Sequence, residues 1–514
     1  MDRRLFKNIF GSWLGLGATV IVGFFLTPFV LHYLGDVGFG LWILTTTVTG
    51  YYGLMDLGLR SAIVRYVSKD VASGDWEGVS RTASTTFFSY SIIGLLIALI
   101  TLLVVWKFDI LFHVAPQWSR SGKLLLLVMG IGSAVTVPVA LFGGILEGIQ
   151  KFYFVGAVQT VTVLIRAGLI VLALRSGFGL VTLGFIAIAS NFCSNLLYWQ
   201  ALRRFCPSLH LSQSNVQKST FRMLFSFGII TFGISMAQQL RFQTDSIVIG
   251  SFLSVQLITL FAIASKLVSY SGDAVQFMAQ VFTPMSSHFE ARGEHKQLQR
   301  ILIVGNRYAS LVILPLASIL LILGKSFIRV WVGPAYLSSY SVLVILTIPM
   351  TLYLAQAAST KILFGMSRHG ALAIALFVEG VANLGLSILL LRWYGVNGVA
   401  LGTAIPMVFT SVFFLPYYLC RLLRMEILTF LMEAYTYPVL VCFPFASVLW
   451  CANHWIHPHN YAGLCLVLLM GGSVYGACLL AYFCKKEHKI SLEISSSVEP
   501  SEADPFKPES PSII

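Results

Sequence analysis

The sequence predicts an all-α protein that crosses a membrane about fourteen times, as two parallel six-helix repeats followed by two further helices. Three observations support this fold class. Of 514 residues, 57% are hydrophobic and only 11% are charged, whereas a soluble domain carries roughly 25% charged residues. Apolar runs of about 20 residues, long enough to cross a hydrocarbon core, recur along nearly the whole chain. A pattern of loop residues also returns about 219 positions later.

Fourteen apolar segments account for the predicted crossings, and no alternation typical of transmembrane strands competes with them. The first segment is followed at once by a second and contains no small-residue cleavage site, so we expect it to remain in the mature protein. In order, the expected spans are 11–33, 38–59, 83–106, 124–146, 155–174, 179–201, 225–250, 255–278, 302–324, 338–361, 371–391, 395–419, 430–452 and 461–484.

The loops between these spans carry their basic residues mostly on one side. Of the 34 Lys and Arg residues, 29 lie outside the spans. If both termini are cytoplasmic, 22 of the 29 fall on the cytoplasmic side and 7 on the other. Cytoplasmic flanks accumulate Lys and Arg, so we expect both termini inside. This imbalance accounts for much of the net charge of +13 without a nucleic-acid partner. The five basic residues within spans are Arg166, Arg241, Lys266, Arg307 and Lys361.

The internal repeat defines the expected domains. A shift of 219 positions lays Tyr51 and Gly53 over Tyr270 and Gly272, and Arg81 over Arg300. An even number of spans separates the copies, so both have the same orientation, related by an axis along the membrane normal. We expect an N-lobe at 1–202, a cytoplasmic linker at 203–222, a C-lobe at 223–420, two additional helices at 421–484 and a disordered cytoplasmic tail at 485–514.

One predicted span contains an unusual number of polar residues, at positions 236–250. Arg241 and Asp245 stand four residues apart, which places them on one face of a helix, where they can pair. A charged group at membrane depth is costly unless it lines a wet cavity or has a partner. We interpret this face as looking into a central, water-filled passage. The alternative is a buried polar pair that only fixes helix packing.

Several motifs add a family resemblance to this pattern. They are YLGDVGFGLW near the start, RFQTDSIVIGSFL opening the second repeat, LFGMSRHG after the tenth span and YGVNGVALGTAI at the twelfth. With six, six and two helices, the chain resembles the polysaccharide-transporter branch of the multidrug/oligosaccharidyl-lipid/polysaccharide (MOP) exporter superfamily over roughly residues 5–425. The resemblance implies a fold like that of multidrug and toxic compound extrusion (MATE) transporters.

The same resemblance implies a function. It indicates a flippase that moves undecaprenyl-diphosphate-linked oligosaccharides, such as O-antigen or capsule and exopolysaccharide repeat units, from the cytoplasmic to the outer leaflet of the bacterial inner membrane. Its partners would be the lipid-linked oligosaccharide, membrane lipids, a glycan polymerase and a chain-length regulator.

The chemistry of such a cargo selects candidate residues. A diphosphate and sugars cannot cross hydrocarbon, so the passage must be wet and cationic, and Arg and Lys are the best phosphate donors. Arg307 lies near the start of its span and could alternatively reach back to the interface. The candidates for the substrate cavity are Arg241, Arg166, Lys266 and Arg307, with Gln238, Gln239 and Gln243.

Acidic residues at depth are candidates for coupling to an ion. A carboxyl group partly removed from water can load and release a proton near neutral pH. We therefore expect Asp245, Glu379 and Asn383 to serve if H+ or Na+ drives transport; no other cofactor is expected. The alternative is that Asp245 neutralises Arg241 and that Glu379 pairs with Arg166 or another basic residue.

Other chemistry has little support in the sequence. The eight cysteines contain no C-x-x-C pair, and no catalytic residues or metal ligands are indicated. The segment 365–370 has the spacing of a phosphate-binding loop, but Ala371 and Leu372 stand in place of its Lys and Ser or Thr. Two alternatives to a glycan flippase share the fold, a drug or metabolite/cation antiporter and a lipid II flippase. A membrane glycan polymerase or ligase would need a larger outer loop than 107–123.

Overall fold

The computed structural model describes residues 3–497, with side chains from 17 to 229 and from 231 to 481, and every regular element in this part of the chain is helical. The first half contains α1 (Arg3–Tyr52), η1 (Gly53–Asp56), α2 (Leu59–Ala72), α3 (Trp76–Trp106), α4 (Phe108–Leu111), α5 (Pro116–Gly148), α6 (Phe152–Arg175), α7 (Leu180–Phe205) and η2 (Gln213–Asn215). The second half contains α8 (Lys218–Phe242), α9 (Thr244–Phe252), α10 (Val255–Ala279), α11 (Phe282–Ala291), α12 (His295–Trp331), η3 (Pro334–Tyr336), α13 (Ser339–Leu354), α14 (Ala357–Gly365), α15 (Gly370–Phe409), the π-helix η4 (Thr410–Phe414), α16 (Leu415–Leu423), α17 (Ile427–Ile456) and α18 (Tyr461–Ser497).

Length and composition make this a polytopic membrane protein. Within the described residues, ten helices are long and apolar enough to cross a membrane, or up to twelve if each of two bent pairs is one span. Two of the long helices are interrupted by a glycine with non-helical backbone, α1 at Gly35 (φ 66°) and α15 at Gly395 (φ 55°). A positive φ is accessible to glycine at little cost. The expected loops between the first two spans and between the eleventh and twelfth are thus reduced to one residue each.

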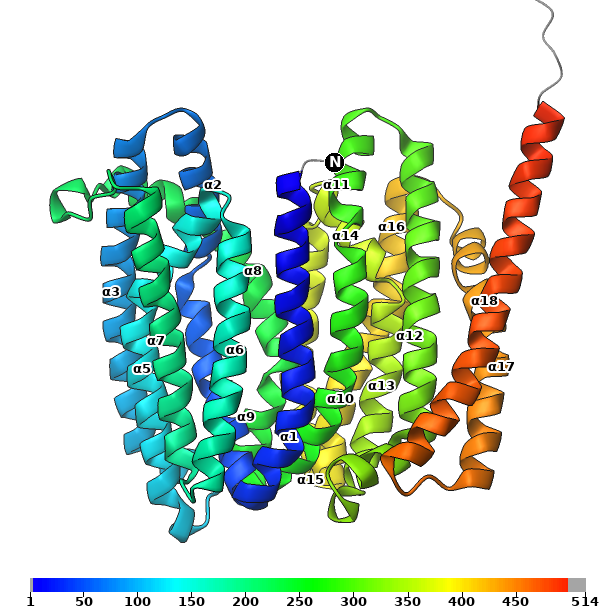
Figure 1. Cartoon of the computed structure of the whole chain (residues 1–514), viewed down its shortest axis with the longest axis horizontal. Coiled ribbons are helices and arrows are strands. Elements are labelled where there is room, and N and C mark those ends of the chain that lie inside the picture. Colours follow the sequence, from blue (N-terminus) through cyan, green and yellow to red (C-terminus); the bar gives the residue numbers. More distant parts are fainter. Residues whose placement is uncertain (1–2, 498–514) are drawn as a thin grey trace, which may run out of the picture.

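The helices form two bundles side by side (Figure 1). We call α2, α3, α5, α6 and α7 the N-bundle and α10 to α16 the C-bundle, and α17 and α18 pack at the far edge of the C-bundle beside α12. Residue 3 and residue 497 lie at the same end of the helices, which we call the termini face, and the other end is the opposite face.

Two helices connect the bundles. α1 packs on α6 of the N-bundle and on α10 of the C-bundle. It also contacts α12, where the Phe24 ring stacks on Trp331 at 5.3 Å and Trp331 Nε1 donates to the Phe24 carbonyl. α8 begins against α2. A Cβ atom at Gly58 would lie 2.2 Å from the carbonyl oxygen of Gly228, so only glycine permits this backbone contact.

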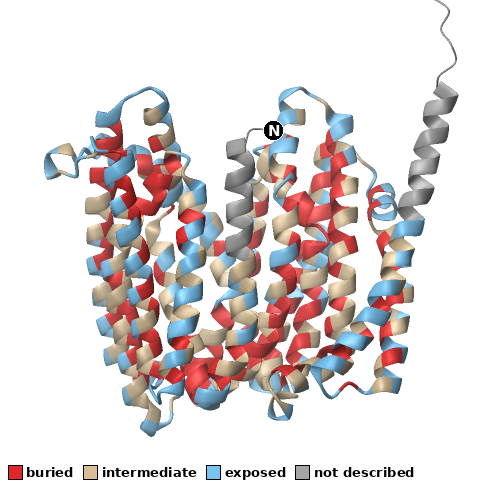
Figure 2. Ribbon diagram, in the orientation of Figure 1, coloured by how far each residue is buried: buried red, intermediate tan, exposed pale blue. Residues whose placement is uncertain are grey.

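The buried core is distributed unevenly between the two faces (Figure 2). The largest hydrophobic cluster lies toward the opposite face and includes residues of both bundles, among them Leu125, Ile258 and Leu343. Toward the termini face each bundle has a cluster of its own, around Ile145 and around Ile362 respectively. The bundles are therefore joined by apolar packing at the opposite face and pack separately at the termini face.

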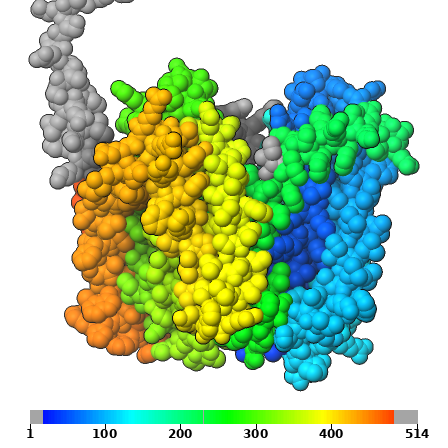
Figure 3. Space-filling model, turned by 180° about the vertical axis from the view of Figure 1, so that it is seen from behind, coloured from blue at the N-terminus to red at the C-terminus, as the bar shows by residue number. Residues whose placement is uncertain are grey.

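Several helix ends differ from the sequence expectation. The linker is shorter than 203–222, because α7 continues to Phe205 and α8 begins at Lys218. It lies over the termini face of the N-bundle (Figure 3), where Ser84 Oγ bonds the His210 carbonyl at 3.3 Å. At the chain end α18 continues to Ser497; the rest of the expected tail, 498–514, lies outside the described residues, and its disorder stays a prediction.

Candidate functional site

The polar segment at 236–250 is broken rather than continuous. α8 ends at Phe242, Gln243 has φ −120° and ψ −9°, and α9 begins at Thr244. Tyr51 of α1 shares a hydrogen bond of 2.7 Å with the Thr244 hydroxyl at this break. Interrupted helices of this kind place backbone and side-chain polar groups at membrane depth in transporters.

Arg241 does not pair with Asp245, although the spacing allowed it. Its Nε lies 2.5 Å from Glu379 Oε1 of α15, and both side chains are almost completely buried. The guanidinium also lies over the Tyr353 ring, 4.0 Å from its centroid. The break at Gln243 changes the direction of the chain between positions 241 and 245, so the two side chains face different neighbours.

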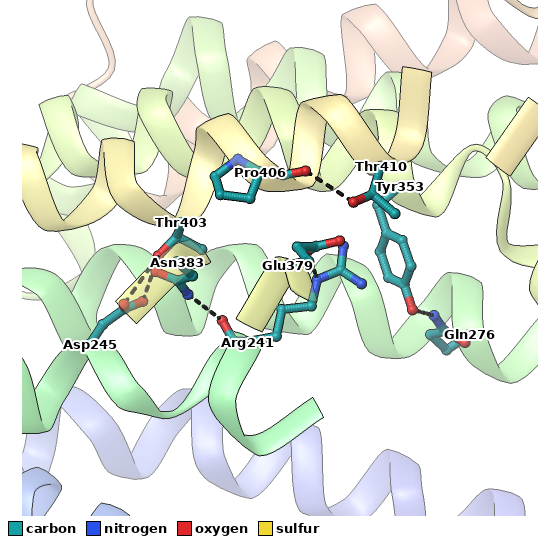
Figure 4. A network of polar contacts seen from close by, with 9 residues as sticks. All are labelled: Arg241, Asp245, Gln276, Tyr353, Glu379, Asn383, Thr403, Pro406 and Thr410. Carbon is teal, nitrogen blue, oxygen red and sulfur yellow. Dashed lines mark hydrogen bonds and ion pairs between the residues drawn. The ribbon is translucent and has the colours of Figure 1, made fainter. Parts of the chain in front are cut away.

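Asp245 instead contacts Thr403, in a hydrogen-bonded network that reaches only the backbone carbonyl of Arg241 (Figure 4). The Thr403 hydroxyl lies 3.1 Å and 3.0 Å from the two Asp245 carboxylate oxygens and 3.1 Å from Asn383 Oδ1. Asn383 Nδ2 donates to the Arg241 carbonyl at 3.0 Å. All four residues are buried, so the network fixes α8, α9 and both parts of α15 relative to one another.

A cavity of about 660 Å³ lies beside this network, between α1, α8, α9, α10, α13, α14 and α15. Its lining contains the cations Arg241, Lys266 and Lys361 and the acids Asp245 and Asp273. Among the described residues neither lysine forms an ion pair, whereas Arg241 is neutralised by Glu379. The cavity is therefore polar and of mixed charge, with two lysines available to an anionic ligand.

Not all of the predicted residues reach this cavity. Gln238 and Gln243 line it, while Gln239, Glu379 and Asn383 lie outside its lining. Of these, Gln239 accepts a hydrogen bond from Tyr51 through its carbonyl. Glu379 and Asn383 do not line the cavity themselves, but both contact Arg241, which does.

Arg307 departs most clearly from the sequence expectation, which placed it in the substrate cavity. It lies on the side of α12 that faces α17, where its Nε donates to the Glu433 carbonyl at 3.1 Å, and it lines neither of the two cavities described here. The additional helix α17 packs against α12 and provides a partner that a single span could not reveal.

Arg166 lies in a second cavity, in the N-bundle. This cavity has a volume of about 390 Å³ and is formed by α1, α2, α5, α6 and α7. Its lining includes Arg60, Gln159 and Asn191 besides Arg166. The structure thus divides the four predicted cations between two cavities and the α12–α17 contact.

Sequence reasoning missed two residues of the C-bundle cavity. Lys361 was placed at the end of a predicted span and not considered further, although a Lys within a span is itself a signal for function. Thr403 carries no charge, so only its hydrogen bonds to Asp245 reveal its place in the network.

The opposite face is closed by direct contacts between sequence-distant segments. Gly40 lies so close to Val255 that a Cβ atom there would be 2.1 Å from the Val255 carbonyl oxygen. The Tyr336 hydroxyl donates to Asp36. Burial, and then this bond, raise the pKa of Tyr336 above its ordinary value. The His113 amide donates to the Gly250 carbonyl at 2.9 Å.

Known protein sequences resemble this chain over much of its length. The sequence model of a family described as polysaccharide biosynthesis protein matches residues 34–341. The chain is 23% identical over 412 residues to the uncharacterized membrane protein EpsK of Bacillus subtilis, covering 79% of this chain and 81% of EpsK. It is 21% identical over 236 residues to the probable low-salt glycan biosynthesis flippase Agl15 of Haloferax volcanii, covering 45% of this chain and 50% of Agl15.

Solved structures share the fold. The lipid II flippase MurJ in an inward closed conformation superimposes with a TM-score of 0.67 at 15% identity, covering 94% of this chain and 99% of MurJ. A MATE family multidrug transporter in an inward-facing conformation gives 0.66 at 14% identity, covering 82% of this chain and 98% of the transporter. At identities of 14% and 15%, the similarity to these structures shows a shared fold and nothing more.

Proposed function

Because the chain belongs to the family described as polysaccharide biosynthesis protein and shares its fold with a lipid II flippase and a MATE transporter, we propose that it flips lipid-linked oligosaccharides across the cytoplasmic membrane of a bacterium. The cargo would be an undecaprenyl-diphosphate-linked repeat unit of O-antigen, capsule or exopolysaccharide. The isoprenoid chain can remain in lipid, whereas the diphosphate and sugars need a hydrated path. A glycan polymerase and a chain-length regulator would act on the product outside.

The observation that carries this proposal is the placement of Lys266 and Lys361 in a polar cavity with no ion-pair partner among the described residues. An ammonium group at membrane depth is costly unless an anion or water compensates it. A diphosphate headgroup supplies such an anion, since its oxygens accept charge-assisted hydrogen bonds from Lys.

Alternating access is supported by the difference between the two faces. The two bundles share an apolar cluster and close contacts toward the opposite face, whereas toward the termini face each bundle has a cluster of its own. With the termini in the cytoplasm, as the basic loops predict, this state would load cargo from the inside. Rocking of two like-oriented lobes, 1–202 and 223–420, would then open the other side. In this proposal we count each side of the breaks at Gly35 and Gly395 as a separate crossing, which would make fourteen spans.

We assign the coupling-ion site to Asp245, Asn383 and Thr403. Their oxygens meet around the Thr403 hydroxyl at 3.0–3.1 Å, and the Val399 carbonyl lies 3.4 Å from the same hydroxyl. Hard cations prefer oxygen ligands of this kind, and the buried carboxylate could alternatively take up a proton. We leave Glu379 out of this proposed site because it forms an ion pair with Arg241.

Deletion of the gene tests the proposed function in the cell. We expect loss of a surface polysaccharide together with accumulation of its lipid-linked unit on the cytoplasmic leaflet, and restoration of both by the unaltered chain. A chain with Lys266→Gln and Lys361→Gln should not restore them. Unchanged surface glycan with greater sensitivity to drugs or dyes would instead indicate an antiporter.

A further inference from the structure

The second cavity, in the N-bundle, has no assigned role in the account above. We propose that it binds the sugar part of the cargo and selects glycan units that carry a carboxylate. This inference rests on the proposed function, since it assumes a lipid-linked glycan as cargo, and it assigns to that cargo a second contact region apart from the C-bundle cavity.

The hydrogen-bonding groups of the lining suit a sugar. Three carboxamides, Gln159, Asn191 and Asn195, line the cavity, and each side chain offers both donors and an acceptor. Sugar hydroxyls likewise donate and accept, so carboxamides can satisfy them in either direction. Hydroxyl groups complete the polar lining; they belong to Thr19, Thr136, Thr162, Ser194 and Tyr198.

The charge of the lining favours an acidic sugar over a neutral one. Arg60 is held by Glu147, with Nη2 2.6 Å from Oε1. Arg166 forms no ion pair with any described residue, and none of the residues that line this cavity is acidic. A guanidinium presents a planar pair of donors that matches a carboxylate. A hexuronic acid would supply this partner.

From the position of Arg166 we infer that the cavity is hydrated. It stands fourteen residues after the start of α6 at Phe152 and nine before its end at Arg175, which places it near the middle of the membrane. Gln159 and Asn191 have exposed side chains on the same cavity wall. Polar groups at this depth face water or protein rather than lipid.

α1 separates this cavity from the one in the C-bundle. Thr19 lines the N-bundle cavity, while Phe24, little more than one turn later, contacts Tyr270 of α10 with ring centroids 6.2 Å apart. The neighbours of Tyr270 on α10, Ser269 and Gly272, line the C-bundle cavity. One helix thus borders both spaces, so a headgroup of several sugars could contact both cavities around α1.

The test compares two cargoes in proteoliposomes that contain the full chain. Both are polyprenyl-diphosphate trisaccharides, and they differ only in the terminal sugar, a neutral hexose or a hexuronic acid. We expect Arg166→Gln to slow movement of the acidic glycolipid by about tenfold or more, the usual range for a lost hydrogen bond to a charged group, and to change the neutral one by less than about twofold. Arg175→Gln, at the end of the same helix, is the matched control and should affect neither.

The outcomes separate this inference from the proposed function. If the unaltered chain moves both glycolipids and Arg166→Gln slows them equally, or slows neither, the acidic-sugar site is wrong while the flippase function stands. If the unaltered chain moves neither, the proposed function fails and the inference with it. If Arg166→Gln does not fold, inhibition of transport by the unaltered chain provides the test instead. A soluble trisaccharide with a hexuronic acid should then inhibit transport at lower concentration than the neutral trisaccharide, and equal inhibition would overturn the proposal.

Discussion

Arg241 and Glu379 form a buried ion pair across α8 and α15, with Nε and Oε1 2.5 Å apart. The pair joins the last turn of α8 to the first part of α15, a helix whose later part lines the C-bundle cavity. Arg241 still lines the cavity, but its charge is compensated. Its first role is therefore to hold the wall of the cavity in place, and the two lysines remain as the cations open to a ligand.

Breaking this pair should destabilise the protein, because removing one partner leaves the other charge buried and uncompensated. We expect Glu379→Gln or Arg241→Gln alone to cost about 3–5 kcal/mol. The double variant should lose less stability than the sum of the losses in the two single variants. The midpoint of thermal unfolding of the purified protein in detergent measures this. Additive losses in the double variant would show that the two side chains do not interact.

Replacing Asp245 should remove the dependence of transport on an ion. Asp245→Asn keeps the shape and the hydrogen-bonding capacity toward Thr403 but removes the charge. We expect the initial transport rate to become independent of Na+ concentration at fixed pH, or of pH at fixed Na+ concentration, whichever the unaltered chain shows. Asp273→Asn, on the lining of the same cavity, is the matched control. If the transport rate of Asp245→Asn depends on Na+ concentration and on pH as that of the unaltered chain does, Asp245 does not bind the coupling ion.

Widening the contact at Gly40 should open the opposite face. A Cβ atom at this position would lie 2.1 Å from the Val255 carbonyl, so Gly40→Ala must separate the two backbones. In a background without native cysteines, a cysteine at Ser265 on the cavity lining should then react with an impermeant thiol reagent added from that side. Gly168→Ala, with nothing within 4 Å of the added Cβ, should leave this cysteine protected. If the cysteine at position 265 is protected equally in Gly40→Ala and Gly168→Ala, the contact at Gly40 does not close the opposite face.

The orientation in the membrane can be measured with two exposed positions. Ser208 lies in the linker at the termini face, and Ser176 lies between α6 and α7 at the opposite face. In the same cysteine-free background, Ser176→Cys should be labelled by an impermeant maleimide in intact cells, and Ser208→Cys only after permeabilisation. The reverse pattern would place the termini outside.

The fold class was predictable because it depends on local composition. Apolar runs of membrane-spanning length and a low charge content require helices that satisfy their own backbone hydrogen bonds. The polar segment around Arg241 also stood out, since charge at membrane depth is rare. The helix ends were less predictable. Helices such as α12 continue well past their apolar part, and nothing in the hydropathy of a segment fixes where the helix stops.

The partners of the charged residues could not be predicted. The spacing favoured a pair of Arg241 with Asp245, four positions away, but the partner of Arg241 is Glu379 in α15. Arg307 contacts a carbonyl of α17. Such pairings depend on how helices pack in three dimensions, and the spacing along one helix shows only which residues share a face.

We propose that the cavity lined by Lys266 and Lys361, which have no ion-pair partner among the described residues, carries an anionic glycolipid headgroup across the membrane. The most direct measurement is the rate at which a polyprenyl-diphosphate oligosaccharide changes leaflets in liposomes containing the purified chain. We predict a rate well above that of protein-free liposomes. The double variant Lys266→Gln and Lys361→Gln should reduce it by about tenfold or more, the range for lost hydrogen bonds to charged groups. A folded double variant as fast as the unaltered chain, or an unaltered chain no faster than lipid alone, would contradict the claim.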